Sequence, residues 1–363
     1  MIRRGGVPRS RLAAGLATGL AVALTMGGTV AAASPPASKP AWQLRLVIQY
    51  RRPVLGSSQY LVTLAEPRDT WFFGGSNLAG RGVPEVALRT GGKWQYPALP
   101  DGLRSWIAAV SAQSPSDIWA VTYLGGAVLN WNGSAWRTEP AGNWAAGTQF
   151  TGINAVAADS VWLFGAGGSS FPGAGTWHWD GSAWTRKQGL AGDVRQASAI
   201  SATDIWAIGG IGGTRNALLQ LSGTTWRHVR STALTGFRFS DVLALGRGNV
   251  WVAGSVAGDN LLSHFDGQRW TTTTMPGSVP ATGICRDGRG GLWVIANSGH
   301  RPSVVRDRSA TGHWTTSTVS SSSADELASC AWSRQTRTAW GAGKSAALQT
   351  GSAAAVYAYG KVP

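Results

Sequence analysis

The side chains that could perform metal or acid–base chemistry form no recognisable pattern in this sequence. The five histidines, His178, His228, His264, His300 and His313, include no pair at metal-ligand spacing. The seventeen acidic residues include no pair that suggests general acid–base work, and the D-x-D-x-D-G spacing of a calcium loop is missing. The sequence therefore predicts no metal, no cofactor and no catalytic residue.

Several acids recur at one point of a repeating pattern. Asp69, Asp117, Asp159 and Asp204 each come just before a recurring tryptophan. An Asp at such a place can accept hydrogen bonds from the backbone of a turn. We therefore interpret these acids as structural.

Aromatic and basic side chains suggest binding instead. The candidate ligand-binding residues are Tyr60, Arg104, Trp106, Phe150, Arg195, Arg238 and Phe239. The four aromatic residues stand at equivalent points of different repeats, and the arginines lie beside them in sequence. Gathered at one mouth of a channel, they would form a platform on which sugar rings or aromatic groups stack. The alternative is that these rings fill the top of the core.

The charge balance favours an anionic partner. The formal net charge is +15 at pH 7, and such a chain attracts polyanions in a salt-dependent way. Basic residues are scattered, with no Lys/Arg run, so no nucleic-acid partner is expected. Outside a cell the abundant polyanions are wall polymers, acidic polysaccharides and membrane headgroups. A bias of composition alone would give the same charge.

The elements that must position these residues follow from repeated tryptophans. One Trp recurs with a mean period of about 45 residues, within the range of propeller blades of four strands each. We call these the marker tryptophans: Trp71, Trp119, Trp162, Trp206, Trp251, Trp293 and Trp340. Seven markers predict an all-β, seven-bladed β-propeller with four-stranded antiparallel blades.

A second Trp closes each repeat except the last. It recurs at Trp94, Trp136, Trp184, Trp226, Trp270 and Trp314. Turn dipeptides such as Asn132-Gly133 and Asp180-Gly181 precede it, and they supply the positive φ of tight hairpins. We expect most of these tryptophans to pack in the core.

The last repeat lacks its closing strand, and a spare strand stands near the other end of the chain. Residues 42–48 begin with Trp42, and we expect them to pair with residues 354–359, so that both termini build the last blade. Such closure would remove the free edges of an open stack. The propeller would span residues 42–363.

Cys285 and Cys330 are the only cysteines. Both fall on predicted innermost strands of neighbouring blades. In an exported chain they are candidates for a disulfide between blades. The alternative is two buried thiols too far apart to join.

The repeat resembles the kelch motif. Ile205-Trp206-Ala207-Ile208-Gly209-Gly210 and Trp71-Phe72-Phe73-Gly74-Gly75 carry the resemblance, although the double glycine is lost in other repeats. Kelch repeats form six- or seven-bladed propellers such as the central domain of galactose oxidase. Enzymes of that kind hold copper with two Tyr and two His, a set this sequence does not offer, so the resemblance implies the fold and little about function.

Residues 1–33 have the pattern of a cleaved export signal. A basic start is followed by an apolar stretch from Leu12, and Ala31-Ala32-Ala33 precede Ser34. An uncleaved anchor is the alternative, and the route of export, general secretory or twin-arginine, stays open. Residues 34–41 would be a Pro/Ser-rich spacer, and the mature chain would have no stable membrane anchor.

These features predict a secreted or wall-associated, monomeric, non-catalytic propeller. It would bind an extracellular glycan, a cell-wall polyanion or a protein through the face that carries its longer loops. The alternative is a carbohydrate-active enzyme, a polysaccharide lyase or glycoside hydrolase, on the same scaffold. A purely structural interaction protein is a third possibility.

Overall fold

The computed structural model describes most of the chain after residue 41. The described residues are 42–48, 58–65, 68–78, 81–165, 175–187, 194–211, 214–297, 303–319, 325–334, 336–348 and 351–359. The predicted export signal and spacer lie outside them. Pro40–Pro363 form one compact unit. Within the described residues, no helix has the length and apolar character needed to cross a bilayer.

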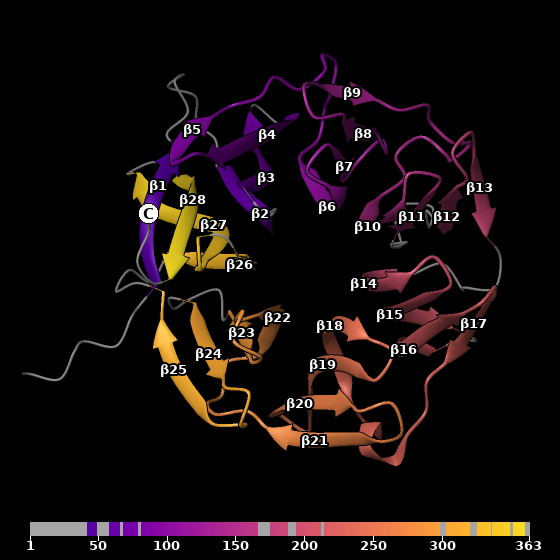
Figure 1. Cartoon of the computed structure of the whole chain (residues 1–363), viewed down its shortest axis with the longest axis vertical. Coiled ribbons are helices and arrows are strands. Elements are labelled where there is room, and N and C mark those ends of the chain that lie inside the picture. Colours follow the sequence, from indigo (N-terminus) through magenta and orange to yellow (C-terminus); the bar gives the residue numbers. More distant parts are fainter. Residues whose placement is uncertain are drawn as a thin grey trace, which may run out of the picture. The chain divides into compact units, whose positions relative to one another are not determined.

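The described strands form seven sheets of four antiparallel strands (Figure 1). Blade 1 consists of β2 (Ser58–Ala65), β3 (Asp69–Leu78), β4 (Arg81–Thr90) and β5 (Lys93–Gln95). Blade 2 consists of β6 (Ile107–Ser114), β7 (Asp117–Thr122), β8 (Val128–Trp131) and β9 (Trp136–Thr138). Blade 3 consists of β10 (Phe150–Ala157), β11 (Ser160–Gly165), β12 (Thr176–Trp179) and β13 (Trp184–Lys187). Blade 4 consists of β14 (Val194–Ser201), β15 (Asp204–Ile211), β16 (Thr214–Ser222) and β17 (Thr225–His228).

The second half of the chain continues the pattern after a 3₁₀ turn, η1 (Thr232–Leu234). Blade 5 consists of β18 (Arg238–Gly246), β19 (Asn249–Val256), β20 (Asp259–Phe265) and β21 (Trp270–Thr274). Blade 6 consists of β22 (Ala281–Arg286), β23 (Leu292–Ala296), β24 (Val304–Arg308) and β25 (Trp314–Thr318). Blade 7 consists of β26 (Glu326–Ser333), β27 (Thr338–Leu348), β28 (Gly351–Tyr359) and, from the start of the propeller, β1 (Trp42–Ile48).

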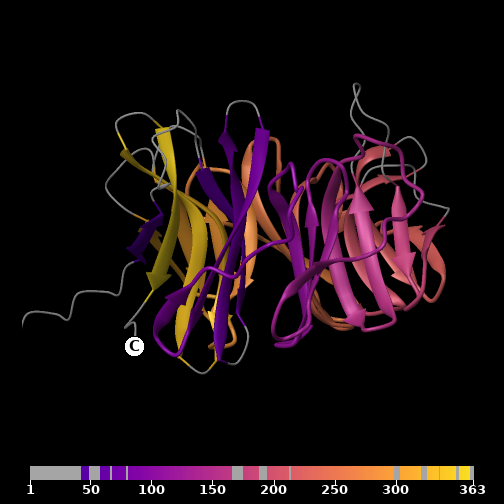
Figure 2. The same cartoon turned by 90° about the horizontal axis from the view of Figure 1, so that it is seen from above.

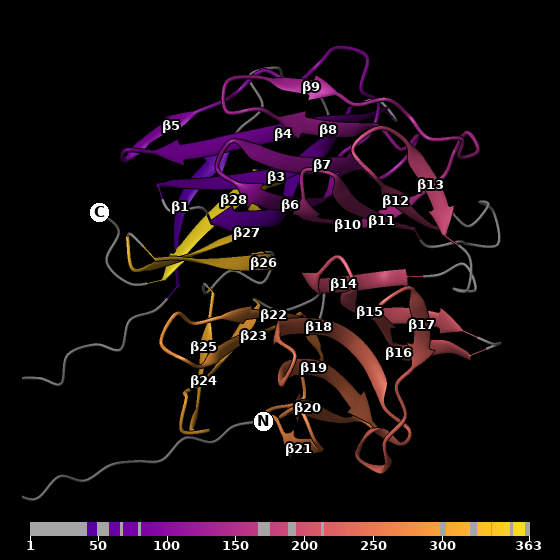
Figure 3. The ribbon, with the colours of Figure 1, turned by 45° about the vertical axis from the view of Figure 1, so that its right-hand side comes forward.

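The seven sheets form a closed ring. The first strand of each blade lies next to the first strands of two other blades, and β26 lies next to β2. Figures 1 and 3 show these innermost strands around a common axis, and Figure 2 shows the ring from its edge. The predicted all-β fold of seven four-stranded antiparallel blades is therefore confirmed.

Blade 7 combines strands from the two ends of the propeller. β1 pairs antiparallel with β28, with Trp42 opposite Tyr359 and Ile48 opposite Ala354. β1 is thereby the outermost strand of a sheet whose other three strands come from residues 326–359.

The marker and closing tryptophans pack across the joints between blades. The Trp71 ring of blade 1 meets the Trp136 ring of blade 2 edge to face, with centroids 5.8 Å apart. Trp340 of blade 7 meets Trp94 of blade 1 in the same way at 6.4 Å. In blade 6 the partner of Trp293 is Tyr359, at 5.3 Å. Such rings fill the wedge between twisted sheets, as the sequence pattern indicated.

The outer hairpins are built by local polar turns. The side-chain Oδ1 of Asp180 accepts hydrogen bonds from the backbone N–H groups of Ser182 and Ala183, at 2.9 and 2.8 Å. Gly181 has a φ of +93°, a conformation that L side chains rarely adopt. Asn132 and Asp266 make the same turn in blades 2 and 5. The predicted role of the Asn-Gly and Asp-Gly dipeptides is confirmed.

The innermost strands are joined by side chains that stand eight residues before the marker tryptophans. The Oγ atoms of Ser111 and Ser198 accept N–H bonds from the next blade, at 2.9 and 3.0 Å. Asn154 Oδ1 does the same at 3.2 Å. In blade 5 this position is Leu243, whose side chain accepts no hydrogen bond. Asp241 is the acceptor there instead, and its Oδ2 accepts the N–H of Ile284 at 2.7 Å.

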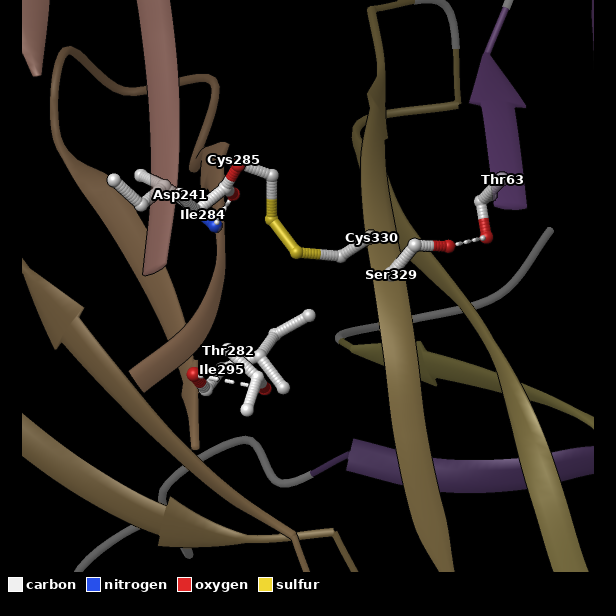
Figure 4. The surroundings of a disulfide bond; sticks show 8 residues. All are labelled: Thr63, Asp241, Thr282, Ile284, Cys285, Ile295, Ser329 and Cys330. Carbon is white, nitrogen blue, oxygen red and sulfur yellow. Dashed lines mark hydrogen bonds between the residues drawn. A yellow bond between two sulfur atoms is a disulfide. The ribbon is translucent and has the colours of Figure 1, made fainter. Parts of the chain in front are cut away.

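Blades 6 and 7 are joined by a covalent bond instead. Cys285 on β22 and Cys330 on β26 form a disulfide, with Cα atoms 5.9 Å apart (Figure 4). This is the pairing for which the sequence made the two cysteines candidates. Beside it, the hydroxyl groups of Ser329 and Thr63 lie 3.1 Å apart and join blade 7 to blade 1.

Candidate functional site

The turns between the first and second strands of the blades lie on one face, which we call the turn face. In blade 2 only Pro115 and Ser116 separate the two strands, and in blade 4 only Ala202 and Thr203. In blade 6 the connection runs over residues 287–291, and in blade 7 over residues 334–337. The turn face therefore changes where blades 6 and 7 meet.

A cavity of about 770 Å³ opens at these longer turns, and we call it the arginine cleft. It is lined by Leu245, Asn249, Trp251, His264, Arg286, Gly288, Gly290, Gly291, Leu292, Trp332, Arg334 and Arg337. These residues come from blades 5, 6 and 7. A volume of this size is typical of sites that hold drug-sized ligands.

Three arginines give the cleft its charge. Arg286 ends β22, and Arg334 and Arg337 belong to the turn between β26 and β27. All three are exposed, and none has an acidic partner among the described residues. Desolvation and the neighbouring charge of Arg334 lower the pKa of Arg286. The cleft therefore brings together positive charges that repel one another, and an anion would relieve this repulsion.

Arg289, in the same turn of blade 6, behaves differently. Its guanidinium lies 2.8 Å from Asp307 Oδ2 and 3.5 Å from Asp287 Oδ2. Asp287 is buried and accepts the N–H groups of Arg289 and Gly291 at 2.7 and 2.8 Å, which fixes the shape of the turn. This arginine is anchored within the protein, so it does not add a free guanidinium to the cleft.

One wall of the cleft is an aromatic stack. The rings of Trp251 and His264 are nearly parallel, 18° apart, with centroids 4.0 Å apart. The Arg308 guanidinium lies 4.8 Å from the Trp251 ring. Asn249 Oδ1 accepts the Trp251 Nε1–H at 2.7 Å and lies 3.1 Å from His264 Nε2.

His264 adds little charge to this wall at neutral pH. Burial, and then the positive charge of Arg308, lower the pKa of its imidazole. The ring is therefore mostly neutral at pH 7, and the positive charge of the cleft comes from its arginines.

Trp332 also lines the cleft. Its indole packs directly on Gly288, where a Cβ atom would collide with the ring, and Gly288 has a φ of +73°. The ring centroid lies 6.1 Å from that of Trp293, which is fully buried. This glycine allows the turn of blade 6 to lie against the indole.

The residues predicted to bind a ligand lie at the opposite ends of the innermost strands, on the loop face. Arg104, Arg195 and Arg238 are exposed there, near the starts of β6, β14 and β18. Trp106 is half-buried and stacks on Tyr123, with centroids 5.1 Å apart. Tyr60 is on β2, opposite Gly74, and its side chain lies outside the described residues. Several connections of this face, among them residues 49–57 and 166–174, also lie outside the described part of the chain.

Two of the predicted platform aromatics belong to the core. Phe150 has no exposed surface and packs edge to face on Trp144 at 5.1 Å. Phe239 is buried and packs on Phe237 at 4.9 Å. Their rings therefore offer no face to a ligand, and the predicted platform loses these two members. The reason is that loop residues, which the repeat pattern does not cover, fold over them.

A smaller cavity of about 260 Å³ lies along the ring axis, lined by the innermost strands. Asp241 is in its wall, where its carboxylate accepts the N–H groups of Val242 and Ile284 at 2.8 and 2.7 Å. Burial raises the pKa of Asp241 to about 7, although both hydrogen bonds favour the ionised form. The described residues include no group of three or more His, Cys, Asp or Glu able to hold a metal.

The sequence interpretation missed the arginine cleft. Trp251 was expected in the core with the other marker tryptophans, but it is half-buried and borders the cleft. A signal was present: the turn before the marker Trp is longer in blades 6 and 7 than in blades 2–4, and it carries Arg289 in blade 6 and Arg334 and Arg337 in blade 7. No feature of the sequence indicated that Arg286, Arg334 and Arg337 have no acidic partner among the described residues.

No protein-family model and no curated protein matches the sequence. Solved structures are similar in fold. A structure described as YCF48 bound to D1 peptide has a TM-score of 0.62 at 13% identity, covering 90% of this chain and 97% of that one. YCF48 from Cyanidioschyzon merolae has a TM-score of 0.59 at 13% identity, covering 88% and 98%.

A catalytically inactive virginiamycin B lyase from Staphylococcus aureus, solved with quinupristin, has a TM-score of 0.63 at 10% identity, covering 87% of this chain and 99% of that one. These identities show the propeller fold alone. The specific relationship to kelch proteins stays a prediction.

Proposed function

We propose that this chain is a secreted, non-catalytic binding protein that holds an anionic ligand, part of an extracellular protein or glycan, in the arginine cleft. The site proposed from the structure is therefore on the turn face, whereas the sequence favoured the loop face.

One observation carries the proposal: Arg286, Arg334 and Arg337 line one cavity without an acidic partner among the described residues. Guanidinium groups match carboxylates and phosphates with paired hydrogen bonds, which makes them typical residues of anion-binding sites. Surface arginines usually find a neighbouring acid or stand apart from one another. Three that share a cavity without an acid favour a ligand that brings the negative charge.

Two further features support binding. The described residues that line the cleft include no carboxylate, and hydrolysis of a glycosidic bond normally uses two. A similar scaffold, YCF48, is described as bound to a peptide. A carbohydrate-active enzyme remains the alternative, and it would need its acids elsewhere on the ring.

The proposal is tested with labelled polyanions of two kinds, poly-L-glutamate and polygalacturonate, with uncharged dextran as the reference. Fluorescence anisotropy at 50 and 300 mM NaCl should show binding of at least one polyanion that weakens with salt, since exposed charges are screened. The triple variant Arg286→Gln, Arg334→Gln, Arg337→Gln should reduce the affinity at least tenfold.

The matched control is the triple variant Arg104→Gln, Arg195→Gln, Arg238→Gln, which removes the same charge from the loop face. It should keep most of the affinity. Failure of both polyanions to bind would refute the proposal, and so would equal losses in the two triple variants, because that result would mean that only net charge matters.

A further inference from the structure

The shape and chemistry of the arginine cleft restrict the kind of anion that fits it. This restriction rests on the proposed function, because it concerns the ligand of the same site. Three observations bear on it: where the arginines come from, what covers the aromatic rings, and how large the cavity is.

The arginines are spread over two blades. Arg286 is at the end of β22 in blade 6, while Arg334 and Arg337 are in the turn of blade 7. Gly290 and Gly291 line the cavity beside Arg286. The cavity that these arginines line spans the joint between the two blades, so it has room for a ligand chain that carries more than one anionic group.

The aromatic rings of the cleft are poor platforms for sugars. Trp251 has His264 stacked on it at 4.0 Å and the Arg308 guanidinium at 4.8 Å. Trp332 packs on Gly288. Stacking of a pyranose needs a free ring face, and these contacts take up part of the ring surface that a sugar would use.

The remaining surface suits a polypeptide. The cavity of about 770 Å³ is larger than a single phosphate or carboxylate requires, and Leu245 contributes an apolar group to its lining. Glycines allow a ligand backbone to approach closely, because they have no side chain in the way. A short segment that combines acidic and apolar side chains can contact all of these features at once.

We propose that the arginine cleft binds an acidic peptide segment of a protein partner, with carboxylates of that segment paired to Arg286 on blade 6 and to Arg334 and Arg337 on blade 7. The joint between the two blades, held by the Cys285–Cys330 disulfide, keeps the two groups of arginines at a fixed separation. Recognition would depend on the spacing of the acids along the segment.

The test compares four labelled probes on the full chain by fluorescence anisotropy. They are a ten-residue peptide alternating aspartate with leucine, the same peptide with asparagine for aspartate, a short polygalacturonate of similar charge, and inorganic polyphosphate. The acidic peptide should bind most tightly, at least tenfold tighter than the amide peptide and at least threefold tighter than either polymer. Arg334→Gln with Arg337→Gln should reduce its affinity at least tenfold, whereas Arg195→Gln with Arg238→Gln should change it less than twofold.

The other outcomes separate the two proposals. If polygalacturonate or polyphosphate binds as tightly as the acidic peptide and with the same dependence on the cleft arginines, the peptide inference is wrong and the anion-binding function stands. If none of the anionic probes binds, both are wrong. If the amide peptide binds as tightly as the acidic one, the arginines do not recognise carboxylates and the inference is also wrong.

Discussion

Blades 2–4 and blades 6–7 share one fold but differ around the turn between the first and second strands of each blade. In blades 2 and 4 the second strand starts with an acid whose carboxylate is used at once: Asp117 accepts from Asn130 at 2.8 Å and Asp204 from Gln220 at 3.1 Å. Around the longer turns of blades 6 and 7, Arg286 at the end of β22 and Arg334 and Arg337 in the turn of blade 7 find no such partner among the described residues. The acids of blades 2 and 4 are used in hydrogen bonds within the fold, whereas Arg286, Arg334 and Arg337 keep a charge with which a ligand can pair.

The joints between innermost strands differ in the same way. Ser111, Asn154 and Ser198 join their blades to the next by single hydrogen bonds, whereas the joint under the arginine cleft is a disulfide. A covalent bond between blades 6 and 7 keeps the two blades at a fixed distance where both line the arginine cleft. The same repeat thus serves packing in blades 2–4, whereas at blades 6 and 7 it leaves Arg286, Arg334 and Arg337 without an acidic partner among the described residues.

The disulfide between blades 6 and 7 is expected to contribute more to the free energy of unfolding than any other joint between innermost strands. Cys285→Ser with Cys330→Ser removes a crosslink that spans 45 residues, and the loss of such a bond costs about 3 kcal/mol of unfolding free energy. Denaturant unfolding measures it. Reduction of the wild-type chain should give a similar loss and leave the double variant unchanged. A loss below about 0.5 kcal/mol would show that this joint is no stronger than the hydrogen-bonded ones.

Charge reversal in the turn of blade 7 should have the next largest effect, on binding alone. Arg334→Glu with Arg337→Glu should weaken binding of the acidic peptide about a hundredfold, close to 2.7 kcal/mol, because attraction becomes repulsion. The melting temperature should stay within a few degrees of wild type, since both side chains are exposed. Arg195→Glu with Arg238→Glu is the control, and an equal loss there would remove the distinction between the two faces.

The carboxylate joint between blades 5 and 6 should make stability depend on pH. Below about pH 4, Asp241 is protonated in the folded and unfolded states alike. Between that pH and about 7 the folded state keeps a proton that the unfolded state loses, because the folded pKa is raised to about 7. The unfolding free energy should therefore fall by about 2–3 kcal/mol from pH 5 to pH 8 through this group.

Asp241→Asn checks this contribution, because the amide oxygen still accepts a hydrogen bond but does not titrate. Its unfolding free energy, measured with denaturant at pH 5, 6.5 and 8, should decline less than that of the wild type. Parallel curves for the two proteins would contradict the assigned pKa. Asn154, the neutral equivalent in blade 3, supplies the comparison within the same ring.

The hydrogen-bonded joints should be the weakest individually. Ser198→Ala removes the acceptor of the Ala244 N–H bond between blades 4 and 5, and we expect a loss of about 1 kcal/mol. Ser111→Ala should give a similar value in blade 2. Neither variant should change binding of the acidic peptide, and a tenfold change would mean that the cleft is coupled to joints on other blades.

The sequence determined the fold of the described chain, because its information was local and repeated. The marker tryptophans, the Asn-Gly and Asp-Gly turns and the two cysteines each report on a hairpin or an innermost strand, and the closed ring follows from stacking copies of one unit. Seven blades and the disulfide were both predictable for this reason.

The proposed binding site depended on contacts that only the tertiary structure shows. Whether a loop covers Phe150 or Phe239, and whether Arg286 meets an acid, is decided by segments far away in the chain, to which the period of the repeat does not apply. Arg286 and Arg334 become neighbours only after β22 and β26 lie side by side. Composition fixed how much positive charge the chain carries, and the packing of blades against one another decided where that charge is left without a partner.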